Sequence, residues 1–109
     1  KADLLLSIHA DSHHDPSISG PSLYIARAAS TQSRRVATSI HSAFRNEGIP
    51  SRGIRRADFK VLSQHNQPAV LVETGYLTNA SEARNLNTNW YRTKIAKCIV
   101  AGIIHSLGR

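Results

Sequence analysis

Apolar residues along this chain follow two patterns: short continuous runs, and longer stretches in which they recur every three or four positions. The short runs are rich in β-branched residues, which is typical of buried strands in an α/β sheet. They lie at residues 4–8 and 69–72, and a third segment, residues 21–27, alternates apolar and polar positions. We expect these segments to form strands, and we expect those at residues 4–8 and 69–72 to be buried.

The longer stretches predict three helices. Val36, Ile40 and Phe44 lie four positions apart and form one apolar face of a helix ending near Asn46, with Gly48 just beyond it. A short helix is expected over residues 80–86, and a well-packed last helix runs to about Leu107. The candidate N-caps are Ser30 or Thr31, then Thr78, Asn79 or Ser81, then Thr88 or Asn89.

Turn-forming residues connect these elements. Residues 11–20 combine Asp, Ser, Pro and Gly, which predicts a loop, and we expect its His13 and His14 to be solvated. Residues 49–58 predict a basic loop, and residues 59–62 a short extended piece.

Composition limits the class of protein. A chain of 109 residues is expected to form one domain, and its net charge of +7 favours an anionic partner such as nucleic acid, an acidic polymer, or a membrane or wall surface. Cys98 is the only cysteine, which excludes an intrachain disulfide. The chain begins at Lys1 and has neither a membrane span nor a signal-peptide pattern, as an excised or mature segment would. Oligomeric state is not indicated.

Two of the expected strands end in polar side chains, His9 and Glu73. Open α/β sheets bind ligands at the carboxyl ends of their strands, and Gly75 allows a sharp turn there. A zinc hydrolase needs an imidazole ligand, an open position for water and a carboxylate beside that water. His9 suits the first role and Glu73 the last, whereas spacing alone supplies no further ligands.

Each of these residues also has a structural explanation. His9 could be hydrogen-bonded to a neighbouring loop, and Glu73 could form an ion pair with an arginine. Arg52, Arg55 and Arg56 could be a solvated basic segment, or they could bind substrate carboxylates through their forked guanidinium groups.

The other histidines are weaker candidates. His9 and His13 lie four apart, but this spacing binds metal from one face of a helix, and here a strand enters a loop. We expect His41 and His105 at the surface. His65 precedes the last strand, and we expect it to pack in the loop there, although it could approach the site.

Four segments carry motifs in a fixed order. They are KADLLLSIHAD at residues 1–11, GPSLYI at 20–25, FKVL at 59–62 and PAVLVETGYLTN at 68–79, with Glu82 following. Together they resemble the zinc-dependent N-acetylmuramoyl-L-alanine amidases of the amidase-3 family, across nearly the whole chain.

The resemblance implies a function as well as a fold. The fold is α/β, with a central, mostly parallel twisted sheet flanked by helices on both faces. The activity is hydrolysis of the amide bond between N-acetylmuramic acid and the L-alanine of the stem peptide. The resemblance implies Zn²⁺ as cofactor, His9 as a zinc ligand and Glu73 as catalytic acid/base. It further implies peptidoglycan as partner, and the periplasm or the cell exterior as location, as for an autolysin.

The same resemblance predicts an incomplete domain. Family members carry a ligand histidine on an earlier strand and then a ligand glutamate; neither motif occurs in residues 1–109, and Glu47 does not match the latter. The chain therefore resembles the carboxyl-terminal part of a catalytic domain. We expect a sheet that lacks its first strands and exposes an edge.

Two other classes of function stay open. A non-catalytic peptidoglycan-binding or scaffold domain is favoured by the missing ligands, although such a domain does not need Glu73. A nucleic-acid-binding domain is suggested only by charge. It ranks last, because aromatic residues are 6% of the chain and none interleave with the arginines.

Overall fold

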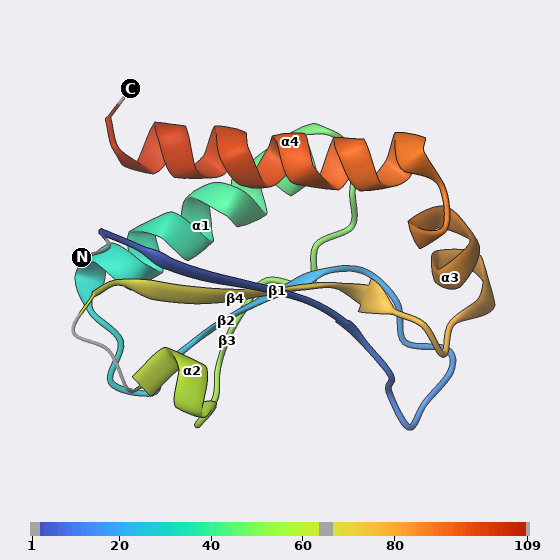
Figure 1. Cartoon of the computed structure of the whole chain (residues 1–109), viewed down its shortest axis with the longest axis horizontal. Helices are drawn as coiled ribbons and strands as arrows, with labels where there is room; N and C mark the ends of the chain where they lie inside the picture. The colour runs from blue at the N-terminus through green and yellow to red at the C-terminus, as the bar shows by residue number, and fades with distance from the viewer. Residues whose placement is uncertain (1–2, 64–66, 109) are drawn as a thin grey trace.

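The computed structural model describes residues 3–63 and 67–108 and places them in four strands and four helices (Figure 1). In chain order these are β1 (Leu5–Asp11), β2 (Ser22–Ile25), α1 (Thr31–Asn46), β3 (Ile54–Arg56), α2 (Lys60–Ser63), β4 (Ala69–Tyr76), α3 (Ala80–Leu86) and α4 (Asn89–Ser106). Lys1 and His65, on which the sequence carried expectations, lie outside the described residues.

The strands form one sheet in the order β1-β4-β2-β3. β1 runs parallel to β4 and β2 parallel to β3, whereas β2 and β4 are antiparallel. The expected mostly parallel sheet is therefore confirmed. β4 lies between two strands, and every one of its residues is buried.

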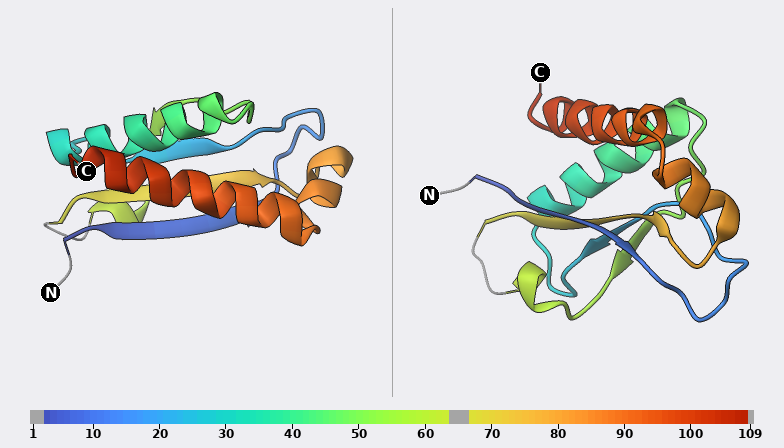
Figure 2. Two further views of the ribbon diagram at one scale, coloured as in Figure 1. Left: turned by 90° about the horizontal axis from the view of Figure 1, so that it is seen from above. Right: turned by 45° about the vertical axis from the view of Figure 1, so that its right-hand side comes forward.

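Helices cover both faces of this sheet (Figures 1 and 2). α1 and α4 lie on one face, and the short α2 lies on the other. The larger core, beneath α1 and α4, consists of Leu23, Ile25, Val36, Ala37, Ile40, Phe44, Ile49, Val70, Val72, Ile95, Cys98 and Ile99. Leu62 of α2 packs with Ala69 and Leu71 on the opposite face. No helix of the described segments has the length and apolar character needed to cross a membrane.

Side-chain caps begin the three longer helices. Ser30, Asn79 and Thr88 accept hydrogen bonds from the backbone N–H groups of Ser33, Glu82 and Tyr91 respectively. Each satisfies a donor that the first helical turn leaves without a partner. Gly48 follows α1 with φ of 74°, a conformation that favours glycine. These predictions are confirmed.

The expectation of a buried first strand is wrong. β1 lies at the edge of the sheet, none of its residues is fully buried, and Ile8 is 57% exposed. An apolar run predicts a strand but does not reveal how many neighbours the strand has. The exposed edge that the resemblance predicted is confirmed.

Three local expectations are also corrected. Ile54–Arg56 is a strand rather than loop, because pairing with β2 supplies its backbone partners. Residues 59–62 are not extended, since Lys60–Ser63 forms one helical turn that buries Leu62. The chain does not turn at Gly75 either: β4 continues to Tyr76.

Candidate active site at the carboxyl ends of β1 and β4

His9 and Glu73 project from one face of the sheet. They are register partners in the parallel strands β1 and β4, and partners in neighbouring strands point to the same side. Their face carries α2, because Val70 and Val72 belong to the core on the opposite face. Both border a cavity of about 560 Å³ lined by Ser7, His9, Asp11, Ser12, His13, Tyr24, Phe59, Lys60, Val61, Leu71, Glu73 and Tyr76.

Glu73 lies at the inner end of this cavity and is only 4% exposed. Its Oε1 accepts a hydrogen bond of 2.8 Å from the Asp11 N–H. Burial above all, together with the Asp11 and Glu82 carboxylates, raises the pKa of Glu73 to about 7, although the Asp11 N–H acts in the opposite direction. Among the described residues Glu73 forms no ion pair, so the alternative of an arginine partner is wrong. A carboxyl with this pKa can both accept and release a proton near neutral pH.

His9 occupies the more open side of the cavity, with 42% of its side chain exposed. Its Nε2 lies 2.8 Å from Ser7 Oγ, and its Nδ1 lies 3.9 Å from Asp11 Oδ2. Both partners belong to β1 itself. The alternative in which His9 is hydrogen-bonded to a neighbouring loop is therefore not what the structure shows. The imidazole is open to the cavity, and its role as a metal ligand stays a prediction.

A complete metal site is not formed by residues 3–63 and 67–108. No group of three His, Cys, Asp or Glu side chains among them is placed to hold an ion. His13 borders the same cavity, yet its Nδ1 accepts from the Asp15 N–H at 3.0 Å and its ring stands edge-on to Tyr76, with centroids 5.2 Å apart. His13 is therefore half-buried rather than solvated, whereas His14 is exposed as expected. The donors present fit one zinc ligand, His9.

The three arginines differ in their surroundings. Arg56, the last residue of β3, donates to the carbonyl oxygens of Ala26 and Arg27, at 3.2 and 2.8 Å, and so holds the end of β3 to the segment that follows β2. Arg55 is the register partner of Tyr24, which lines the cavity, and it therefore leaves β3 on the same face. Neither these two nor Arg52 borders the cavity itself. Substrate binding by this segment stays a prediction.

Tyr76 is a site residue that the sequence patterns did not single out. β1 and β4 shift register after His9 and Glu73, so that Asp11 pairs with Tyr76. β4 thus uses one residue more than β1, as in a β-bulge, which re-aims the next side chain. Tyr76 consequently lines the cavity, and burial, together with Tyr24, raises its pKa to about 12. The one sequence feature that could have indicated this bulge is Gly75, since a glycine inside a strand often marks a bulge.

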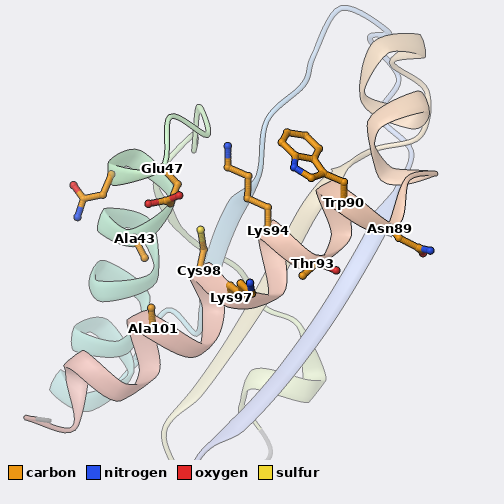
Figure 3. Close-up of a pocket in the computed structure, with 10 residues that line it drawn as sticks. Ala43, Glu47, Asn89, Trp90, Thr93, Lys94, Lys97, Cys98 and Ala101 are labelled. Atoms are coloured by element: carbon orange, nitrogen blue, oxygen red, sulfur yellow. The ribbon is translucent and has the colours of Figure 1, made fainter.

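A larger groove of about 900 Å³ lies on the other side of the molecule, between α1 and α4 (Figure 3). Lys94 lies over the ring of Trp90 there, 5.3 Å from its centroid, and Glu47 and Cys98 line the wall. None of the predicted site residues contributes to it. Size therefore does not locate the candidate site, whereas the strand ends do.

The architecture and the site define an α/β domain with a cavity that a histidine and a carboxylate border at the ends of two parallel strands. Residues 1–105 match the family Amidase_3, described as N-acetylmuramoyl-L-alanine amidase. The chain belongs to this family, and the predicted resemblance is confirmed.

Individual relatives agree with this assignment. The N-acetylmuramoyl-L-alanine amidase LytC of Bacillus subtilis is 37% identical over 106 residues, which are 95% of this chain and 21% of LytC. YqiI of the same organism is 37% identical over 94% of this chain and 50% of its own length. This chain thus spans between about a fifth and a half of these relatives.

Solved structures match the fold. The catalytic domain of CwlV from Bacillus (Paenibacillus) polymyxa var. colistinus has a TM-score of 0.86 and 35% identity, over 98% of this chain and 59% of that one. The N-acetylmuramoyl-L-alanine amidase from Clostridium difficile 630 has a TM-score of 0.91 and 30% identity, with the same coverage.

Proposed function

We propose that this chain is part of a zinc-dependent peptidoglycan hydrolase that cleaves the amide bond between N-acetylmuramic acid and the L-alanine of the stem peptide. One observation carries the proposal: His9, accessible, and Glu73, buried with a pKa of about 7, face the same cavity from paired strand ends. Membership in the amidase family supports the substrate class. The cell envelope or the cell exterior is where such a substrate occurs.

His9 would hold the metal together with ligands from outside residues 3–63 and 67–108, since these form no three-ligand group. That two further ligands lie upstream is what the family resemblance implies. When bound, zinc polarises the scissile carbonyl and lowers the pKa of a water molecule.

Glu73 would move the proton. The Asp11 N–H holds Oε1 through a hydrogen bond of 2.8 Å. In its charged form it takes a proton from the attacking water, and it then returns that proton to the departing alanine amine. Bond cleavage and protonation of the leaving group therefore use one residue. Arg55 and its neighbours would bind carboxylates of the stem peptide.

Zinc content tests the proposal. We would compare the chain itself with a fusion in which the amino-terminal part of the CwlV catalytic domain precedes it. The fusion is expected to contain about one zinc per molecule by elemental analysis and to release stem peptide from muropeptides. His9→Ala should remove the zinc, and His105→Ala, at an exposed position on α4, should not. A folded fusion whose zinc survives His9→Ala would overturn the ligand assignment.

A non-catalytic peptidoglycan-binding domain is the second candidate, favoured by the incomplete ligand set of the described residues. It predicts that the chain itself, without the fused segment, sediments with purified peptidoglycan and releases no peptide. Release of peptide at a rate that depends on Glu73 excludes it.

A further inference from the structure

Glu82 carries a buried carboxylate that joins two distant segments. The residue is only 6% exposed. Its Oε1 accepts a hydrogen bond from the Tyr76 N–H at 2.5 Å, and its Oε2 accepts one from the Gly20 N–H at 2.7 Å. Within the described residues it forms no ion pair. Two backbone donors therefore satisfy its charge.

Local structure directs this carboxylate across the chain. Asn79 and Glu82 have the spacing of a capping box, in which the glutamate returns to the backbone N–H of the cap. Here the Asn79 N–H donates to the Tyr76 carbonyl at 3.0 Å instead. Gly75 makes the room, since a Cβ at that position would lie 2.5 Å from the Cδ of Glu82.

The segment that Glu82 anchors borders the cavity. Residues 12–20 are also held by the His13 N–H, which donates to Thr78 Oγ1 at 3.0 Å, and by Asn79 Nδ2, which donates to the Pro16 carbonyl at 3.0 Å. These two contacts are exposed, whereas the contact with Glu82 is buried. Ser12 and His13 of this loop line the cavity, and Asp11, just before it, donates its N–H to Glu73.

We propose that Glu82 is a positioning residue of this site: its carboxylate fixes the loop of residues 12–20 to the end of β4, so that the Asp11 N–H faces Glu73 and Tyr76 lines the cavity. This inference rests on the proposed function only in that it treats Glu73 as the reacting carboxylate. Glu82 positions backbone N–H groups around the site, so it need not touch substrate.

NMR spectroscopy of the wild-type chain tests the contacts directly. Couplings across the hydrogen bonds from the Gly20 and Tyr76 amides to the Glu82 carboxyl carbon should be observed. In Glu82→Gln the side chain keeps only one acceptor oxygen, so only one of the two backbone N–H groups, that of Gly20 or that of Tyr76, keeps its hydrogen bond. The other N–H group meets the glutamine NH₂ group, which is itself a donor. Exchange of the Gly20 or the Tyr76 amide should rise about tenfold to hundredfold, as expected for loss of a charged hydrogen bond. The Asp11 amide and the Glu73 carboxyl resonances should shift with it.

Two further variants sharpen the result. Gly75→Ala places a methyl group where the Glu82 carboxylate lies, so it should displace that carboxylate and reproduce these changes. Glu47→Gln removes an exposed carboxylate elsewhere and should not reproduce them. Absent couplings in the wild type, unchanged Asp11 and Glu73 resonances in Glu82→Gln, or equal acceleration of all amides would overturn the proposal. None of these readouts uses zinc or amidase activity, so failure of the proposed function is detected separately.

Discussion

His9 and Glu73 lie side by side as register partners in β1 and β4, yet their solvation differs: 42% of the His9 side chain is exposed, whereas Glu73 is 4% exposed. The difference follows from strand position, because β1 is the edge of the sheet and β4 lies inside it. Burial raises the pKa of the Glu73 carboxyl, whereas the His9 imidazole stays open to solvent. The roles proposed for the two residues, proton transfer and metal binding, rest on this difference.

Glu73→Gln should abolish most turnover without removing the metal. Glutamine keeps an acceptor oxygen for the Asp11 N–H but cannot take a proton. In the zinc-loaded fusion we expect initial rates of peptide release to fall by about 10²- to 10⁴-fold, with zinc content unchanged. If Glu73→Gln retains more than about a tenth of the wild-type rate, Glu73 is not the general base, because loss of such a base lowers the rate by more than that.

Glu73 should also make stability depend on pH. Its folded-state pKa is raised from 4.5 to about 7, so the folded protein binds this proton more tightly than the unfolded chain does. The stabilisation is fully present below pH 4.5 and is lost as pH rises through about 7. That interval corresponds to roughly 3 kcal/mol of unfolding free energy.

Urea unfolding of Glu73→Gln at several pH values measures this effect. The variant should be as stable as the wild type near pH 4 and more stable near pH 8, since it carries no charge to bury. Glu47→Gln, at an exposed position, should show no such crossover. Parallel wild-type and Glu73→Gln curves over the whole pH range would contradict the raised pKa.

The helices could be predicted because their determinants are local. Ser30, Asn79 and Thr88 stand next to the stretches they cap, and Val36, Ile40 and Phe44 show their periodicity within three turns. His9 and Glu73 were also identifiable, because polar residues directly follow apolar runs at strand ends.

The remaining features depend on pairings between distant segments. Ile54–Arg56 becomes a strand only beside β2, and Ile8 is exposed because β1 has one neighbour in the described sheet. Tyr76 enters the cavity through a register shift that alternation along β4 does not reveal. The contact between Glu82 and Gly20 likewise joins residues 62 positions apart.

Arg55 and Arg56 should respond differently to substitution. Arg55 leaves β3 on the face of the cavity, whereas Arg56 is bonded to the carbonyls of Ala26 and Arg27. If the basic segment binds stem-peptide carboxylates, Arg55→Glu should raise KM for muropeptides while kcat stays constant. Arg56→Gln should instead lower the free energy of unfolding by about 1 kcal/mol.

Steady-state kinetics at two salt concentrations separates these outcomes, because exposed charge pairs weaken as ionic strength rises. A KM that Arg55→Glu leaves unchanged at low salt would exclude Arg55 from substrate binding.

Gly102 should resist the substitution that helices usually favour. At an exposed helical position Gly→Ala stabilises by about 1 kcal/mol. Here, however, a Cβ would lie 2.6 Å from the Cα of Ile40 and 2.8 Å from its backbone nitrogen. Backbone atoms of α1 cannot yield without separating the two helices, so we expect Gly102→Ala to destabilise by about 1 to 3 kcal/mol.

Urea unfolding of Gly102→Ala shows directly whether the substitution raises or lowers the free energy of unfolding. Val100→Ala is a control on the same helix, since Val100 is 54% exposed and its substitution should change stability little. A stabilised Gly102→Ala would show that α1 and α4 are further apart in solution. The consequence would extend to the site, because the core that these helices form with the sheet contains Val72, the residue directly before Glu73 on β4. A loosened helix layer would therefore also loosen the strand that holds the Glu73 carboxylate.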